Sequence, residues 1–96
     1  MKPDDLLKRK REEILRAVER YGARNVRVFG SVARNEADEK SDIDLLIDPG
    51  PEMSLFTHAE LEIELEELLG RKVHLISARG LRPRVRENVM RDAVPL

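Results

Sequence analysis

The sequence has no cysteine, which excludes a disulfide scaffold and a thiolate metal site and is typical of a reducing cytoplasm. It has no apolar run long enough to cross a bilayer, and its start, Met1 to Asp5, does not resemble a signal peptide. It also lacks an excess of either charge, because 18 Lys and Arg face 19 Asp and Glu. Proteins that bind nucleic acid without specificity carry a basic excess, so we expect no direct nucleic-acid binding. The lack of a spanning apolar run leads us to expect no membrane contact either.

The chain has 96 residues, enough for one compact domain, and contains no linker, internal repeat or low-complexity segment. We therefore predict a single α/β domain over residues 1–96. A domain of this size buries only roughly 60–65% of its unfolded surface. Its stability is expected to be modest, or a partner covers part of its apolar surface in a homo- or hetero-oligomer.

Four helices and three strands are predicted in alternation from apolar periodicity, caps and turn residues. In order they are a helix capped by Asp4 or Asp5 and ending near Tyr21 before Gly22, a strand at Val26–Phe29, a short helix Val32–Arg34 capped by Ser31, a strand at Asp42–Asp48, a helix from the Ser54 cap to Leu69 before Gly70, a strand at Arg71–Ile76, and a helix with Pro83 in its first turn. The helix residues predicted to face the core are Leu7, Ile14, Val18, Tyr21, Leu61, Leu65, Leu68, Val85, Val89 and Ala93.

The candidate chemistry lies between Val26 and Asp48. Gly30 permits an unusual backbone angle after a strand, and Ser31 opens a helix whose free N–H groups are suited to phosphate. Asp42 and Asp44 are one residue apart in the next strand, so their carboxylates project to the same face. Two such carboxylates repel each other unless a cation lies between them. Gly-Ser turns and Asp-x-Asp strands are each common, but their close succession indicates nucleotide chemistry.

Two runs, Phe29-Gly30-Ser31-Val32-Ala33-Arg34 and Ser41-Asp42-Ile43-Asp44-Leu45-Leu46-Ile47, closely resemble the minimal nucleotidyltransferases of the DNA polymerase beta-like superfamily. The resemblance extends to Leu68-Leu69-Gly70-Arg71-Lys72-Val73 and covers most of the chain. It implies the α+β nucleotidyltransferase fold, a small mixed β-sheet backed by helices in the order α-β-α-β-α-β-α.

The resemblance also implies roles for individual residues. Gly30 and Ser31 would hold the triphosphate, and Asp42 and Asp44 would bind Mg²⁺, which prefers hard carboxylate oxygens. The metal would neutralise charge on the α-phosphate and position the incoming hydroxyl. Arg34 is expected either to contact phosphate or to pair on the surface with Glu36 or Asp38.

One position departs from the family pattern. Active members usually carry a third acidic residue in a sequence resembling Lys-Val-Asp-Leu, and here that place reads Lys72-Val73-His74-Leu75. A neutral His74 could accept the hydroxyl proton in catalysis, although imidazole is a poorer ligand for Mg²⁺. Alternatively, the protein binds nucleotide and transfers it slowly or not at all. Asp48 has the strand parity of a substitute carboxylate, but it is expected to lie too far along the strand.

The function implied is a metal-dependent transfer of AMP from ATP to a hydroxyl. Short members of the resembled family commonly accompany a helical HEPN protein, often an RNase toxin, and act as its antitoxin, some by adenylylating a tyrosine of that partner. The resemblance therefore implies a prokaryotic, cytoplasmic antitoxin of a toxin-antitoxin system, with ATP and an HEPN protein as partners. The alternatives are a catalytically weak or inactive nucleotide-binding antitoxin that neutralises its partner by complex formation, and a domain that assists a larger transferase.

Other charged residues are interpreted as solvent-facing. His58 lies on a Glu-rich helix where only Glu62 shares its helical face, so a solvated histidine is preferred to a zinc ligand. The basic run Lys8–Arg11 is assigned to a solvated helix face. The last helix region carries a cluster that is assigned to surface solubility, Arg79, Arg82, Arg84 and Arg86.

Overall fold

The computed structural model describes residues 1–96 and contains four helices and four strands. In chain order they are α1 (Pro3–Arg20), β1 (Arg24–Phe29), α2 (Gly30–Ala33), β2 (Ile43–Asp48), α3 (Leu55–Leu69), β3 (Val73–Ser77), α4 (Pro83–Asp92) and β4 (Val94–Pro95). The strands form one sheet in the order β3-β2-β1-β4. β1 is antiparallel to β2 and to β4, whereas β2 and β3 are parallel.

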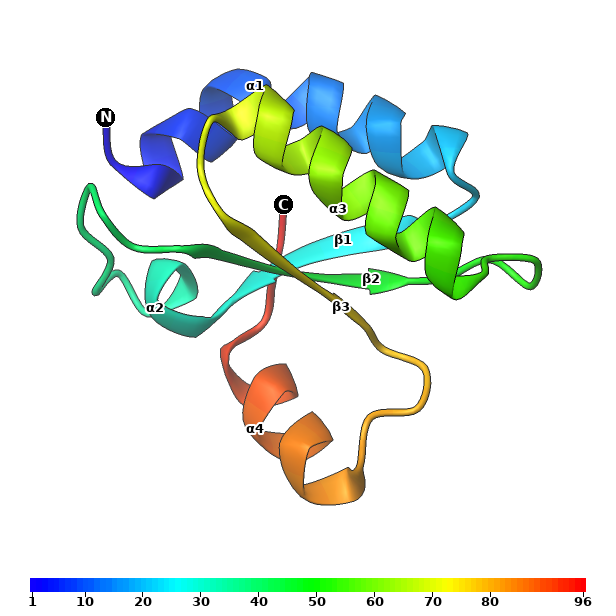
Figure 1. The fold of residues 1–96 in the computed structure, drawn as a ribbon. Helices are drawn as coiled ribbons and strands as arrows, with labels where there is room; N and C mark the ends of the chain where they lie inside the picture. The colour runs from blue at the N-terminus through cyan, green and yellow to red at the C-terminus, as the bar shows by residue number, and fades with distance from the viewer.

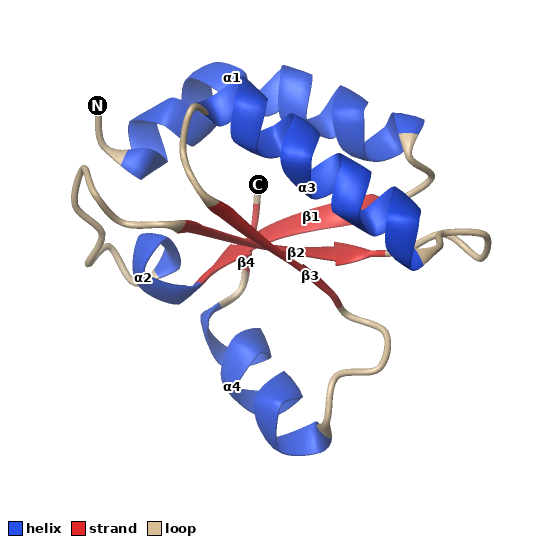
Figure 2. Ribbon diagram, viewed as in Figure 1, coloured by secondary structure: helices blue, strands red, loops and turns tan.

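Helices cover both faces of this sheet (Figures 1 and 2). α1 and α3 pack side by side across one face, α4 lies on the opposite side, and α2 is a single turn at the end of β1. The predicted small mixed sheet backed by helices is therefore confirmed. The short β4 is an addition to the predicted order, and its two residues are too few for a periodic signal. No helix combines the length and the apolarity needed to cross a membrane.

β2 is the central strand of the core. Its residues Ile43, Leu45 and Ile47 are fully buried in the cluster that α1 and α3 share with the sheet. Leu46 points to the other face, with Asp44, and is also fully buried. A strand buried on both faces is held strongly in register, because a slip of one residue would move every side chain to the wrong face.

The two long helices, α1 and α3, begin and end close to the predicted positions, but the residue that caps the start of α1 differs from the prediction. Pro3 occupies the first position of α1 after Lys2, so the predicted caps Asp4 and Asp5 are wrong; both lie inside the first turn. Proline is suited to that position because its missing N–H would have no partner there. Ser54 caps α3 as predicted, since its Oγ accepts a hydrogen bond from the backbone N–H of Thr57 at 3.1 Å.

Several other boundaries and burials differ from the prediction. α2 begins at Gly30 after Phe29, with no side-chain cap, so Ser31 is a helix residue and not the cap. β1 begins two residues early, and β3 begins at Val73 because Arg71 turns away from the sheet to bond a loop. In α3, Leu69 is buried and Leu68 is half-buried. In α4, Val85 is 47% exposed, so its predicted burial is wrong.

Side chains of α3 bond the free edge of β3. Glu66 Oε2 accepts from the backbone N–H of Val73 at 3.1 Å, and Glu62 Oε2 accepts from that of Leu75 at 2.9 Å. His58 Nε2 lies 2.7 Å from the Leu75 carbonyl and therefore donates to it. The prediction of a solvated His58 is wrong, because this half-buried ring is part of an i, i+4, i+8 row along the helix. Bonds of this kind protect an edge strand from pairing with another chain.

We expect Glu62→Ala and Glu66→Ala each to lower the free energy of unfolding by about 1–2 kcal/mol, because each leaves a β3 N–H without its acceptor. Urea denaturation followed by circular dichroism measures the loss. Glu67→Ala is the matched control on the same helix, since Glu67 is exposed, and it should change stability by less than about 0.5 kcal/mol. Equal effects at the three positions would contradict this role of the α3 side chains.

Candidate functional site

The predicted site residues meet at the end of the sheet where β1 runs into α2 and β2 begins. Because β1 and β2 are antiparallel, the end of one lies beside the start of the other, and Phe29 is the register partner of Asp44. On its other side Asp44 is the register partner of His74 in β3. Asp44 therefore lies between the Gly30 turn and His74, and the strand pairing brings these three positions together.

Gly30 and Asp44 are in direct contact. Gly30 has φ = 71°, a left-handed conformation that side chains disfavour. A Cβ built on Gly30 would lie 2.2 Å from Oδ2 of Asp44, a distance too short for two atoms that are not bonded. Glycine is therefore required here for two reasons, the backbone angle and the approach of the carboxylate.

Asp42 and His74 form the second contact of the site. Asp42 lies immediately before β2, and its Oδ2 is 3.0 Å from Nε2 of His74. Both side chains are 46% exposed, so the site is open to solvent. His74 thus stands beside the carboxylate pair, as its place in the family pattern predicts, and its Nε2 bonds a carboxylate oxygen.

Burial raises the pKa of the Asp44 carboxyl above its usual range. Asp42 raises this pKa further, whereas the nearby charges of His74 and Arg34 act to lower it. Ionisation of Asp44 is therefore less favourable in the folded protein than in the unfolded chain. A bound cation would favour that ionised form.

Arg34, at the end of α2, is held by two carboxylates. Its Nη1 lies 2.9 Å from Oδ2 of Asp92, and its Nε lies 3.1 Å from Oε2 of Glu36. The predicted surface pairing with Glu36 is confirmed; Asp38 instead bonds the backbone N–H of Lys40 and the Ser41 hydroxyl, which lowers its own pKa. Sequence reasoning missed Asp92, because nothing in the pattern of α4 indicates that its last residue reaches α2.

Arg71 is a second residue that sequence reasoning missed. Its guanidinium donates to the backbone carbonyls of Ser41 at 2.8 Å, of Asp38 at 3.4 Å and of Glu39, and so holds the polar loop that leads into Asp42. It also donates to the Met1 carbonyl at 3.2 Å. The only sequence signal was its place in the third family segment, Leu68–Val73.

The donor set is suited to Mg²⁺ that binds together with a nucleotide. No group of three or more His, Cys, Asp and Glu side chains is arranged to hold a metal by itself. Mg²⁺ is usually bound by one or two carboxylates and the substrate phosphates, with water in the remaining positions. Asp42 and Asp44 supply such a pair. Asp48, at the far end of β2, bonds Arg27 at 2.8 Å and Asn25 at 2.9 Å, so it does not join the site.

The mixed sheet, the glycine turn and the Asp-x-Asp strand define a nucleotidyltransferase. The family described as Nucleotidyltransferase domain matches residues 9–96, so the chain belongs to this family. Within it the chain is a nucleotidyltransferase of the minimal kind, with 51% identity and a TM-score of 0.85 to a solved minimal nucleotidyltransferase, over 96% of this chain and 94% of that one.

Two further comparisons agree with this assignment. The protein adenylyltransferase MntA of Thermococcus cleftensis is 43% identical over 76 residues, which is 79% of this chain and 77% of that protein. A chain in a crystal structure of a toxin-antitoxin pair with AMP-PNP has a TM-score of 0.77 at 19% identity, over 88% of this chain and 69% of that chain. At that identity the second comparison shows the shared fold alone.

Asp44→Asn and Asp48→Asn make the same chemical change at the two ends of β2, and we expect opposite effects on the Tm of the metal-free protein. The raised pKa of Asp44 means that its ionised form reduces stability as the pH rises through that pKa, so Asp44→Asn should raise the Tm at pH 7 by a few degrees. Hydrogen bonds from Arg27 and Asn25 lower the pKa of Asp48 below its ordinary value of 3.8. The ionised Asp48 therefore stabilises the fold at pH values above 3.8, so Asp48→Asn should lower the Tm at pH 7.

Thermal unfolding by circular dichroism, with chelator present, checks both signs. At about pH 3 the gain at Asp44 should vanish, because the wild-type carboxyl is then protonated, and the loss at Asp48 should shrink as its lowered pKa is approached. A Tm that falls at pH 7 for Asp44→Asn would show that the ionised Asp44 stabilises the fold.

Proposed function

We propose that this chain, as one minimal nucleotidyltransferase domain of residues 1–96 in the cytoplasm, binds ATP with Mg²⁺ and transfers AMP to a hydroxyl on a partner protein. The hydroxyl oxygen forms a bond to the α-phosphorus, the bond between the α- and β-phosphates breaks, and pyrophosphate and the hydroxyl proton are released. The observation that carries the proposal is the direct approach of the Asp44 carboxylate to the Gly30 turn. It brings a phosphate-binding feature and a cation-binding carboxylate into one place. The name of the MntA relative, a protein adenylyltransferase, supports a protein as acceptor.

In this mechanism Asp42 and Asp44 would hold the cation, and the backbone at Gly30 and Ser31 would bind the triphosphate through its N–H groups. When bound there, the cation would neutralise charge on the α-phosphate. Arg34 adds a positive charge next to Asp44, and it must exchange a carboxylate partner for a phosphate to contact the nucleotide. His74 orients Asp42 through their hydrogen bond, in the place where a third carboxylate is usual.

We further propose that the partner is an HEPN-family toxin and that this chain is its antitoxin. Support comes from solved structures that share the fold. One is a toxin-antitoxin pair solved with AMP-PNP, and another is the MntA–HepT toxin-antitoxin pair. AMP-PNP is an ATP analogue, which supports ATP as the nucleotide. The resemblance in the motif region implies the same partnership.

A second candidate function is neutralisation by complex formation without transfer. Two contacts favour it: His74 occupies the third acidic position and engages Asp42, and Arg34 is held by Asp92 and Glu36. In that case the nucleotide site would be inherited and dispensable. Antitoxin activity in cells would then survive the double change Asp42→Asn with Asp44→Asn.

Asp42→Asn and Asp44→Asn should each lower the rate of AMP transfer by about 100-fold or more, because each removes a charge that holds the cation at the reacting phosphate. The measurement is incorporation of label from α-³²P-ATP, with Mg²⁺ present, into the purified HEPN-family protein proposed as the partner of this chain. Asp48→Asn is the matched control, since Asp48 lies at the opposite end of β2, and its rate should stay within about threefold of wild type.

His74→Asp restores the acidic residue that the family pattern expects and should keep or raise the transfer rate. If wild type and His74→Asp both leave the HEPN protein unlabelled, transfer to that protein is the wrong function. The complex-formation candidate would then be preferred.

Gly30→Ala should abolish stabilisation by Mg²⁺ and ATP, because the added Cβ displaces the Asp44 carboxylate from the turn. Gly70→Ala is its matched control: Gly70 also has a positive φ, 63°, but a Cβ there would meet no atom within 4 Å. We expect each change to cost about 1 kcal/mol of stability, since the Asp44 side chain can move aside.

Differential scanning fluorimetry with and without Mg²⁺ and ATP separates the two variants. Wild type and Gly70→Ala should gain several degrees in Tm at saturating ligand, and Gly30→Ala should gain none. Equal gains in both variants would mean that the contact between Gly30 and Asp44 is not part of the nucleotide site.

A further inference from the structure

The segment around α3 carries a strong and one-sided charge. Residues 49–70 contain six glutamates and no lysine or arginine, although the whole chain is nearly neutral. Glu62 and Glu66 bond β3, and Glu64 forms a two-point contact with Arg20 at 3.0 and 3.4 Å. Glu60 and Glu67 are exposed and form no ion pair, so their charge faces solvent.

The same helix exposes large apolar side chains. Leu55 is 88% exposed, Phe56 is 82% exposed and Ile63 is 55% exposed. Phe56, Glu60, Ile63 and Glu67 follow the i, i+4, i+7, i+11 spacing and therefore form one stripe. α3 has a second, buried apolar stripe toward the core, so the exposed one is not needed for folding. We call Leu55, Phe56, Glu60, Ile63 and Glu67 together the α3 face.

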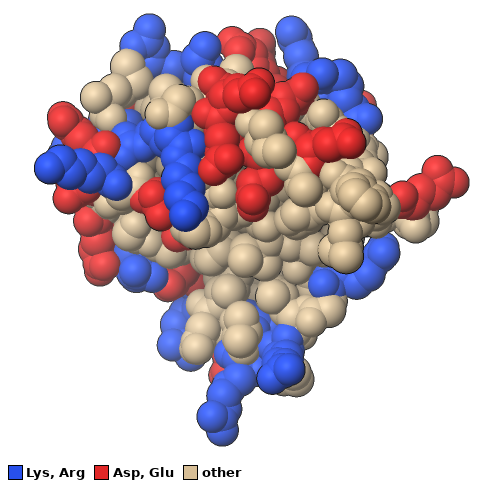
Figure 3. Space-filling model, viewed as in Figure 1, with Lys and Arg blue, Asp and Glu red and all other residues tan.

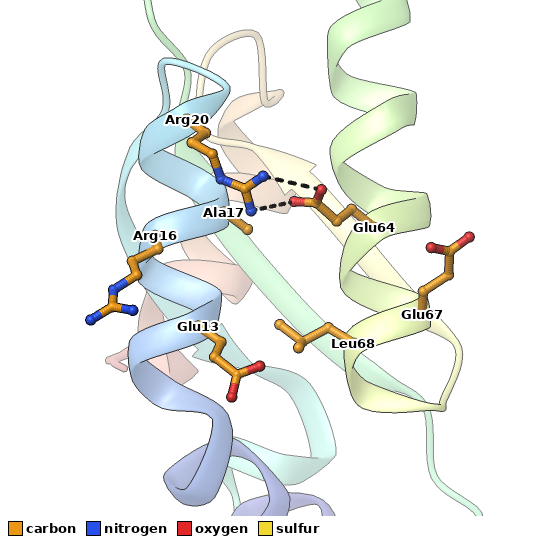
Figure 4. Close-up of a pocket in the computed structure, with 7 residues that line it drawn as sticks. All are labelled: Glu13, Arg16, Ala17, Arg20, Glu64, Glu67 and Leu68. Atoms are coloured by element: carbon orange, nitrogen blue, oxygen red, sulfur yellow. Dashed lines mark hydrogen bonds and ion pairs between the residues drawn. The ribbon is translucent and has the colours of Figure 1, made fainter.

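A groove runs beside the α3 face, between α1 and α3. It encloses about 490 Å³, and Ala17 and Leu68 are its apolar lining residues (Figure 4). Glu13 projects toward the gap, Arg16 and Glu67 point outward from the two helices at its rim, and the Arg20–Glu64 contact spans the helices (Figure 4). Glu67 belongs to both the groove and the α3 face, which makes them one continuous surface.

The charge of this surface limits the class of partner that can bind it. The space-filling view shows carboxylates gathered over α3, with uncharged surface next to them (Figure 3). Membranes with anionic lipids and nucleic acids are both negatively charged, so an acidic face repels them. Apolar side chains framed by carboxylates are complementary to a protein surface that presents apolar side chains framed by Lys and Arg.

We propose that the α3 face and the adjoining groove are the docking surface for the acceptor protein, which presents apolar side chains flanked by lysine and arginine. The identity of that acceptor rests on the proposed function. Leu55 and Phe56 follow the end of β2 that carries Asp48, whereas Asp42 and Asp44 lie at its beginning. Asp44 points to the face of the sheet opposite α3, so docking at α3 leaves the nucleotide site uncovered. The acceptor must then reach around the end of the sheet where β2 begins to bring its hydroxyl there.

The test measures binding of the full 96-residue chain to the purified HEPN protein by biolayer interferometry. Phe56→Asp and Ile63→Asp should each weaken the affinity by about tenfold or more, because each places a charge in an apolar contact. The double change Glu60→Lys with Glu67→Lys should weaken binding and flatten its dependence on salt. Val85→Asp and Glu87→Lys on α4 are the matched controls, since both residues are exposed and away from α3.

The outcomes separate this inference from the proposed function. If wild type binds the HEPN protein and transfers AMP to it, and Phe56→Asp and Ile63→Asp both bind within about twofold of the wild-type affinity, the docking surface is wrong and the proposed function stands. No binding of wild type would overturn both. Sedimentation that shows a wild-type dimer, lost in Phe56→Asp, would mean that a second copy of the chain covers the α3 face, which also overturns the inference. Unchanged thermal unfolding of the variants shows that they are folded.

Discussion

The site depends on one close approach, the carboxylate of Asp44 against the backbone of Gly30. It is possible only because residue 30 has no side chain and adopts φ = 71°. Antiparallel pairing of β1 with β2 supplies the approach, and burial raises the pKa of Asp44 as a consequence. The protein thus keeps a carboxylate in surroundings that disfavour its charge, which is the expected cost if Asp44 belongs to a preformed cation site, as proposed.

The rest of the structure holds this contact in place. β2 is buried on both faces, so its register, and with it the position of Asp44, is strongly determined. Arg71 fixes the loop that leads into Asp42, and His74 bonds the Asp42 carboxylate from β3. Side chains of α3 complete the hydrogen bonds of β3 from outside the sheet. The inward side of α3 therefore supports the site indirectly, while its outward side is the proposed docking surface.

Much of this arrangement could be predicted from local sequence. The Asp-x-Asp alternation in β2, the glycine turn and the Ser54 cap are short-range signals, and they identified individual elements of the α/β domain. The mixed sheet and the place of His74 came from the resemblance to the minimal nucleotidyltransferases. Contacts between distant segments could not be predicted in this way. Asp92 contacts Arg34 only because α4 packs near α2, and Arg71 bonds a loop about thirty residues earlier in the chain. His58 has the sequence pattern of a surface residue, and its hydrogen bond to β3 appears only in the folded structure. Pro3 displaced the predicted acidic cap because a proline at the first helical position competes with a capping side chain further on.

The proposed nucleotide site joins the Gly30 turn to the carboxylates of Asp42 and Asp44. A crystal structure of the chain with Mg²⁺ and a non-hydrolysable ATP analogue tests it most directly. If the site is as proposed, both carboxylates and phosphate oxygens will bind the cation, and the triphosphate will lie on the backbone of Gly30 and Ser31. A triphosphate bound elsewhere, or a cation that contacts neither carboxylate, would contradict it.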